Sequence, residues 1–156
     1  MNPVECQSSL AFAGVTFRGL TCEQLVIPSS GLKLVFPVNA ELILMAQDNP
    51  EFREILSRNS STFDGFWPHL VARLRSRKQV QKISGSEYVH SVFECAARQN
   101  LKVFFLGAMP SVNQAAREEI SSRYGIAIDG YSPDFESYPY TVETNAVILQ
   151  KIRCPN

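Results

Sequence analysis

The stretch that decides the fold is Leu101–Tyr131, which reads LKVFFLGAMPSVNQAAREEISSRYGIAIDGY. It begins with the apolar run Val103–Leu106, which is typical of a strand buried on both faces of a parallel sheet. Near its end, Ile126–Ile128 predicts a second short strand. Because a helix-forming segment separates the two runs, the stretch is expected to form a βαβ unit.

The segment between these strands carries the signals of a helix. Ser111 and Gln114 have the spacing of a capping box, and Gly125 is expected to end the helix. One face of this helix is expected to be an apolar stripe, formed by Val112, Ala116, Ile120 and Tyr124. The turn at 107–110 would direct N–H groups and a positive helix end toward the carboxyl edge of the sheet, where anionic ligands bind. A purely structural crossover fits the segment equally well.

The rest of the chain shows the same alternation of elements. Strands are predicted at 10–27 (short, joined at Gly14 and Gly19), 32–36 and 60–63. Helices are predicted at 40–46 (buried), from Pro50, from Pro68 with Leu70, Val71 and Leu74 inward, at 84–100 and at 141–152. Ser84 and Glu87 have the spacing of a capping box, and the last helix is expected to present an apolar face through Val142, Ala146 and Leu149. Because the strands are continuous apolar runs, we expect one α/β domain over residues 1–156, with a mostly parallel sheet.

Composition excludes several classes of function. Fifteen basic and fifteen acidic residues cancel, so no overall field favours nucleic acid. The lengths of the apolar runs and the N-terminal pattern argue against a membrane span and a signal peptide. The cysteines are widely spaced and lack a histidine cluster, which favours reduced thiols over disulfides or a metal site; they are Cys6, Cys22, Cys95 and Cys154.

A basic run follows the helix that is predicted from Pro68. It holds five cations and no acid: Arg73, Arg75, Arg77, Lys78 and Lys82. The simplest interpretation is a solvated helix face and loop. The alternative is a surface that attracts a diphosphate or an anionic lipid surface.

Polar or flexible residues follow three of the predicted strands, at Asn39, at Asp64-Gly65 and at 107–110. An Asn side chain can bind hydroxyl groups through its paired donor and acceptor. An Asp at a strand end can act as a general base, although Asp-Gly is also a common turn dipeptide. In an α/β fold these strand ends converge, which predicts a cleft for a polar, phosphorylated small molecule.

Five segments, in order, resemble the WecG/TagA/CpsF glycosyltransferases (glycosyltransferase family 26). They are VNAELILMAQDNPEFREIL, the Asp64-Gly65 pair, KISGSE, LKVFFLGAMPSVNQAA and DGYSPDFE, and the similarity runs from about Phe17 to the last residue. The resemblance implies a Rossmann-like sandwich with helices on both faces. It also implies transfer of a sugar from a UDP-sugar, often N-acetylmannosamine or its uronic acid, to an undecaprenyl-diphosphate-linked acceptor. This reaction would occur without a cofactor or metal, at the cytoplasmic face of the membrane, in teichoic acid or exopolysaccharide synthesis.

The resemblance further implies roles for individual residues. Asp64 corresponds to the proposed catalytic base, and Asn39 corresponds to a residue lining the donor site. Lys82 stands where the family commonly has an Arg, just before the turn Gly85-Ser86-Glu87. The remaining positions implied to bind substrate are Gly65, Gly85, Glu87, Gly107, Met109, Pro110 and Tyr131.

The chain departs from the family pattern in two places. Pro37 replaces a common Thr and has no side-chain hydrogen-bonding group. The family also continues past the helix at 141–152 into a strand, a Gly-rich turn and a basic membrane-docking segment. We therefore expect a C-terminally truncated or shortened form, which alone would not transfer sugar and would tend to self-associate. The alternative is a non-catalytic UDP-sugar-binding or interaction module.

Overall fold

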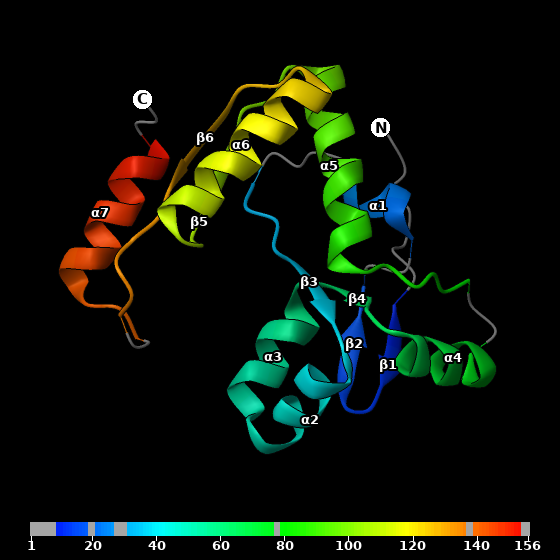
Figure 1. The fold of residues 1–156 in the computed structure, drawn as a ribbon. Helices are drawn as coiled ribbons and strands as arrows, with labels where there is room; N and C mark the ends of the chain where they lie inside the picture. The colour runs from blue at the N-terminus through cyan, green and yellow to red at the C-terminus, as the bar shows by residue number, and fades with distance from the viewer. Residues whose placement is uncertain (1–8, 19–20, 27–30, 77–78, 137–138, 154–156) are drawn as a thin grey trace. The chain divides into compact units, whose positions relative to one another are not determined.

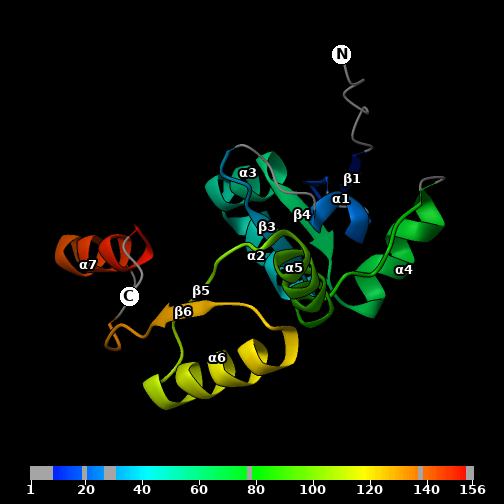
Figure 2. The ribbon, with the colours of Figure 1, turned by 90° about the horizontal axis from the view of Figure 1, so that it is seen from above.

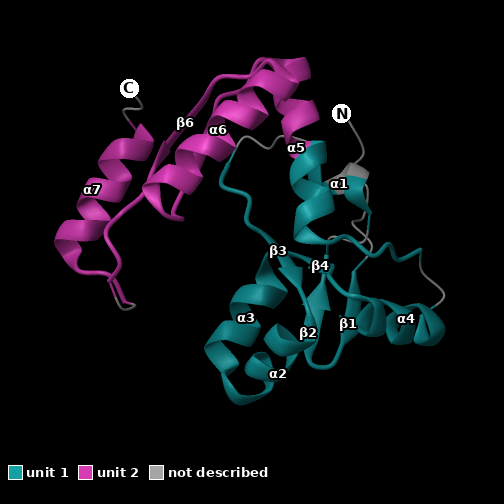
Figure 3. Ribbon diagram, viewed as in Figure 1, with its two compact units in different colours: residues 1–91 teal, residues 92–156 magenta. Residues whose placement is uncertain are grey.

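The computed structural model describes residues 9–18, 21–26, 31–76, 79–136 and 139–153 (Figure 1). The chain groups into two compact units, Met1–Ser91 (unit 1) and Val92–Asn156 (unit 2), shown in Figure 3. Strands and helices alternate through both, which confirms an α/β fold of Rossmann-like type. The single domain expected from the sequence stays a prediction, and each unit is described by itself.

Unit 1 opens with an antiparallel hairpin of β1 (Leu10–Phe12) and β2 (Val15–Phe17). The two linking residues, Ala13 and Gly14, have φ angles of +47° and +77°. Left-handed residues at both positions are typical of the tight turn that joins twisted strands. The predicted joint at Gly14 is therefore confirmed, whereas the one at Gly19 lies outside the described residues. α1 (Cys22–Val26) follows.

The centre of unit 1 is a parallel pair, β3 (Val35–Val38) and β4 (Ser60–Phe63). β4 has the predicted bounds, but β3 starts later than predicted and runs through Pro37. A proline cannot donate to a strand ladder. It is tolerated here because β4 is the only partner of β3 among the strands that the structure describes.

Two helices connect these strands, α2 (Ala40–Asp48) and α3 (Pro50–Arg58). Asn49 caps α3 by accepting the Phe52 N–H at 2.9 Å, and Pro50 holds the first helical position. The prediction that α2 is buried all round was wrong. Ile43 and Ala46 are buried on one face, whereas Leu44 and Met45 are exposed.

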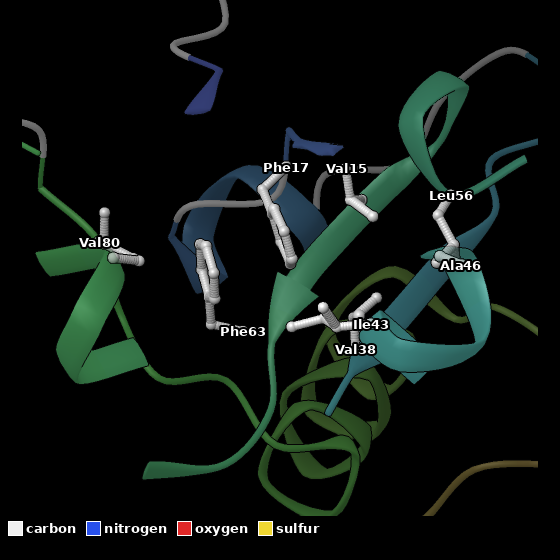
Figure 4. Packing of buried hydrophobic residues seen from close by; sticks show 9 residues of the cluster. Val15, Phe17, Val38, Ile43, Ala46, Leu56, Phe63 and Val80 are labelled. Carbon is white, nitrogen blue, oxygen red and sulfur yellow. The ribbon is translucent and has the colours of Figure 1, made fainter. Parts of the chain in front are cut away.

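One apolar core holds unit 1 together (Figure 4). At its centre the Phe17 and Phe63 rings stack with centroids 3.8 Å apart, which joins the hairpin to β4. The hairpin is also tied to α3, because the Thr16 N–H donates to Ser57 Oγ at 3.1 Å. The buried members of the core are Val15, Phe17, Val38, Ile43, Ala46, Leu56, Phe63, Ala72 and Val80.

α4 (Phe66–Arg75) differs from its prediction in both start and orientation. It begins before Pro68, and it buries Pro68 and Ala72 rather than the larger residues. Leu74, predicted to point inward, is 76% exposed. Small buried residues let a helix lie close against a core, and Ala72 belongs to the core of unit 1.

Unit 2 contains the predicted βαβ unit, with β5 (Val103–Leu106) parallel to β6 (Ile128–Tyr131) and α6 (Pro110–Tyr124) between them. β5 is half-buried, with Leu106 exposed, so the prediction of burial on both faces was wrong. β6 overlaps its predicted range only at Ile128. α5 (Gly85–Gln99) precedes this unit and contributes Phe93 and Ala96 to its core.

The ends of α6 follow the sequence signals in part. Gly125 ends it in the left-handed conformation, as predicted, with φ +65°. The N-cap is Met109 and not Ser111, because Pro110 occupies the first helical position, which suits its fixed φ. Ile120 and Tyr124 pack on the core as predicted. At the start of the helix the prediction fails, since Val112 is exposed and the buried residue is Asn113.

α7 (Val142–Arg153) is the last element and has nearly its predicted bounds. Its buried residue is Ile148. The predicted apolar face of Val142, Ala146 and Leu149 is exposed. Figure 2 shows α7 following β6 along the chain.

Candidate active site

The structure places Asn39 and Asp64 at the same edge of unit 1, at the carboxyl ends of β3 and β4. The last paired residues of the two strands are Val38 and Phe63, and the Asp64 N–H continues the ladder by donating to the Val38 carbonyl at 3.0 Å. Asn39 and Asp64 therefore begin the two loops at this edge. In parallel α/β folds this is the edge at which ligands bind.

Lys82 lies beside the same edge, on the segment that borders β4. Phe63 forms an isolated parallel bridge with Lys82, and the Ile83 N–H donates to the Phe63 carbonyl at 2.8 Å. Thr62, which is fully buried, returns a hydrogen bond from its hydroxyl to the Ile83 carbonyl at 3.1 Å. Lys82 and Ile83 thus lie alongside β4 as a third segment, although the pairing is too short to count as a strand.

The two polar atoms of the Asn39 side-chain amide have different roles. Its Oδ1 accepts the Leu42 N–H at 2.9 Å and so caps α2. The cap fixes the side chain at the strand end and leaves the Nδ2 group as the part that can donate to a ligand. Asn39 is exposed, so a ligand can reach it.

Gly65 lets α4 begin immediately after Asp64. Its φ is +99°, a conformation that other residues rarely adopt. A Cβ at this position would meet only Pro68 Cδ, at 3.8 Å, so the backbone angle and not the space selects glycine. The half-buried Asp64 is thereby held on a sharp turn between a strand and a helix.

Lys82, Ser84 and Glu87 form a polar cluster at the start of α5. Glu87 Oε2 accepts the Ser84 hydroxyl at 2.8 Å and the Ser84 N–H at 3.3 Å, and the Glu87 N–H donates back to Ser84 Oγ at 3.3 Å. This confirms the capping box predicted at 84–87. Lys82 Nζ lies 3.4 Å from the same carboxylate oxygen. The Ser84 bonds first, and then Lys82, lower the pKa of Glu87 below its ordinary value.

Gly85 lies against Pro37, the residue that departs from the family pattern. A Cβ on Gly85 would meet Pro37 Cγ at 3.4 Å. The start of α5 therefore approaches β3 closely. The Pro37 ring, at the position where the resemblance implies a common Thr, thus lies beside Gly85.

A pocket of about 410 Å³ lies next to this cluster. Lys82 and Glu87 belong to its wall, whereas Asn39 and Asp64 do not. Its residues come from distant parts of the chain and form no sequence motif, which is why sequence reasoning missed most of them. They are Cys22, His69, Gln81, Lys82, Ile83, Glu87, Tyr88 and Ser91.

The remaining predicted site residues lie in unit 2, at the carboxyl edge of β5 and β6. The Gly107 N–H donates to the Tyr131 carbonyl at 2.9 Å, and Gly107 has φ +99°. Met109 and Pro110 follow on the exposed turn that starts α6. Gly107, Met109, Pro110 and Tyr131 thus lie at one strand edge within unit 2, whereas the other predicted site residues belong to unit 1: Asn39, Asp64, Gly65, Lys82, Gly85 and Glu87.

Asn113 organises the unit 2 turn and was missed by the sequence interpretation. Its buried Nδ2 donates to the Gly107 carbonyl at 2.9 Å and to the Phe105 carbonyl at 3.2 Å. The Ser132 hydroxyl also donates to the Gly107 carbonyl, at 3.2 Å. The one sequence signal for this role was that Asn113 is polar and directly follows Val112, the first residue of the predicted apolar stripe of α6.

Among the described residues, no three His, Cys, Asp or Glu side chains come together as they would around a metal ion. Within the same ranges, no helix is long and apolar enough to cross a membrane. Cys22 and Cys95, the two cysteines that the structure describes, are reduced.

Residues 10–155 match the model of the Glycosyl transferase WecG/TagA/CpsF family. The match includes every predicted site residue and nearly the whole chain. The resemblance found in the sequence is thereby confirmed.

Proposed function

Because the chain belongs to the WecG/TagA/CpsF glycosyltransferase family, we propose that it transfers an N-acetylmannosamine-type or other hexose from a UDP-sugar to an undecaprenyl-diphosphate-linked acceptor. The family match by itself gives a glycosyltransferase-type function in cell-surface polysaccharide synthesis. The UDP-sugar donor, the lipid-linked acceptor and a location at the inner face of the cell membrane belong to the proposal.

The observation that carries the proposal is the placement of Asn39 and Asp64 at one edge of a parallel strand pair. In the proposed reaction, Asp64 takes the proton from the acceptor hydroxyl as its oxygen attacks the anomeric carbon. The new C–O bond forms as the bond to the diphosphate breaks, and UDP leaves with the electron pair. Asn39 would bind donor hydroxyl groups through its amide.

Lys82 would offset the charge of the diphosphate. In the structure it is paired with Glu87, and the two side chains are 41% and 61% exposed. An ion pair between such exposed groups contributes little to stability, so a diphosphate can displace it easily. Glu87 would then serve to hold Lys82 near the strand edge when no donor is bound.

For unit 2 the proposal is that Gly107, Met109, Pro110 and Tyr131 approach the nucleotide. It is supported by the positive φ of Gly107 and by the start of α6. The first hydrogen bond within that helix runs from the Asn113 N–H to the Met109 carbonyl. The amides of Ser111 and Val112 precede that bond, and amides at a helix start favour anions.

Calorimetric titration with UDP, UDP-N-acetylmannosamine, ADP and NAD tests donor binding. We expect both uridine ligands to bind more tightly than ADP or NAD. Equal or absent binding of all four would contradict the donor assignment.

A sugar-transfer assay with Asp64→Asn tests the base. In a form of the protein that transfers sugar, turnover should fall by about a hundredfold or more, the scale of a lost general base. UDP-sugar affinity should change little, because the proton leaves the acceptor and not the donor. Asp48→Asn, at the exposed end of α2, is the matched control. Near-normal turnover in Asp64→Asn would mean that Asp64 is only a turn residue and not the general base.

A second candidate function is a non-catalytic UDP-sugar-binding module. Pro37 favours it, because the ring packs on Gly85 and offers no hydroxyl to a substrate. Binding of UDP-sugar by the wild-type chain, with no transfer to any lipid-linked acceptor, would support this function over the enzyme.

A further inference from the structure

α4 turns an apolar face toward solvent. Phe66 and Trp67 are 60% and 70% exposed, and Leu74, two turns further on, is 76% exposed. Phe66, Leu70 and Leu74 are spaced four residues apart, so they lie along one side of the helix, and Trp67 lies next to them. The opposite side, with Pro68 and Ala72, is buried.

This orientation is fixed by contacts within unit 1. Ala72 belongs to the apolar core, and the His69 ring nitrogen Nε2 makes a 3.1 Å hydrogen bond with the Val80 carbonyl. The Phe66 and Trp67 rings pack edge to face, with centroids 5.2 Å apart. The exposed aromatic pair is therefore presented by an anchored helix, at the periphery of unit 1 in Figure 1.

The charge beside this face has one sign. The charged residues of α4 are Arg73 and Arg75, both exposed. Over the longer range 65–82 the sequence holds five basic residues and no acid, in a chain whose net charge is zero. Arg77 and Lys78, two of the five, lie outside the described residues.

We propose that α4 docks on an anionic lipid bilayer, with Phe66, Trp67 and Leu74 in the interface and Arg73 and Arg75 at the headgroups. Helices that lie in a membrane interface combine aromatic and leucine residues on one face with basic residues beside them. A ten-residue helix is about 15 Å long, which fits a helix lying on the surface and not a span.

Charge complementarity selects a lipid surface over a second copy of the chain. Two copies of α4 meeting face to face would bring four arginines together around the apolar residues, which like-charge repulsion disfavours. An anionic surface is attracted by the same arginines. Docking through α4 also places Asp64, which directly precedes this helix, near the bilayer; this last benefit rests on the proposed lipid-linked acceptor.

Trp67 is the only tryptophan of the chain, so its fluorescence reports on this helix alone. The full chain is titrated with vesicles of phosphatidylglycerol mixed with phosphatidylcholine, and with phosphatidylcholine alone. We expect a blue shift and quenching by brominated acyl chains with the anionic vesicles, weakened by salt. An unchanged Trp67 spectrum at saturating anionic lipid would overturn the proposal.

Matched variants distinguish the effect of the charge on α4 from the effect of the net charge of the chain. Arg73→Gln/Arg75→Gln should weaken vesicle binding about thirtyfold, since each cation near an anionic surface contributes about 1 kcal/mol and 1.4 kcal/mol is tenfold. Arg98→Gln/Lys102→Gln removes the same charge from exposed positions elsewhere and should change binding little. Equal weakening by both pairs, in a sedimentation assay, would contradict docking through α4.

The apolar contribution is tested with Phe66→Ser/Leu74→Ser against Leu44→Ser, an exposed leucine on α2. The α4 variant should lose most vesicle binding, and the control should keep it, with circular dichroism confirming that both are folded. If the α4 variant instead converts a dimer to a monomer and leaves vesicle binding intact, the face is a self-interface and the proposal fails. Vesicles contain no sugar acceptor, so this result is independent of the UDP-sugar titration.

Discussion

Gly130→Ala is the sharpest test of how the Gly107 turn is built. Gly130 lies in β6 opposite Phe105. A Cβ there would stand 2.7 Å from Asn113 Oδ1, 2.7 Å from the Phe105 carbonyl oxygen and 3.0 Å from Arg117 Cδ. Asn113 is the residue that holds the Gly107 carbonyl, so a methyl group at 130 presses on the support of the turn.

The expected cost follows from these distances. Ordinary contacts to carbon are at about 3.5 Å, so each oxygen would have to move by roughly 0.8 Å. The Phe105 oxygen is backbone in a paired strand and cannot rotate away. Overpacking of this kind costs about 1–3 kcal/mol, and we expect the upper half of that range because two oxygens are involved.

Urea unfolding followed by far-ultraviolet circular dichroism measures the change in free energy. Gly31→Ala is the matched control, because a Cβ there would meet nothing within 4 Å. Both changes remove the same backbone freedom from the unfolded chain, so their difference isolates the steric cost. Hydrogen exchange of the Gly107 amide, bonded to Tyr131, should also accelerate in Gly130→Ala. A difference below about 0.5 kcal/mol, within the usual spread of surface substitutions, would refute the reasoning.

Two further predictions concern polar groups at the candidate site. Asn113→Leu should lower the free energy of unfolding by about 1–3 kcal/mol, because it deprives two carbonyls of a buried donor; a neutral result in urea unfolding would mean that water replaces the amide. Ser84→Ala should remove the main cause that lowers the pKa of Glu87. A carboxylate whose pKa is lowered on folding stabilises the folded state at pH values above its ordinary pKa. This contribution is lost as the pH falls through the lowered pKa. Ser84→Ala should therefore flatten the acid limb of the stability profile, and an unchanged limb would contradict the capping role.

The sequence predicted the elements whose signals are local and strong. β4 and β5 have their predicted bounds, and Gly125 ends α6 because glycine adopts the left-handed conformation freely. The Ser84–Glu87 capping box is present, since it needs only residues three apart. β3 and β6 lie later in the sequence than predicted, because flanking apolar residues resemble strand residues until the pairing register is known.

The candidate site could be predicted only where residues follow strands directly. Asn39 and Gly107 follow apolar runs, and Asp64 follows the short strand Ser60–Phe63, so the topology alone brings them to strand ends. The wall of the pocket beside Lys82 could not be predicted, because Cys22, His69 and Ser91 meet only through tertiary packing. Asn113 was hidden for the same reason: its role depends on carbonyls of a different element.

Three departures from local rules in this chain lie beside those same strand ends. Pro37 lies within β3, two residues before Asn39, and α4, directly after Asp64-Gly65, turns its apolar face outward. α6 begins at an uncapped Met109, two residues after Gly107. Natural chains break local rules mainly at functional sites, where another requirement outweighs stability. An outward apolar face next to a proposed base for a lipid-linked acceptor fits this principle, because the exposure that weakens folding in water favours contact with a bilayer.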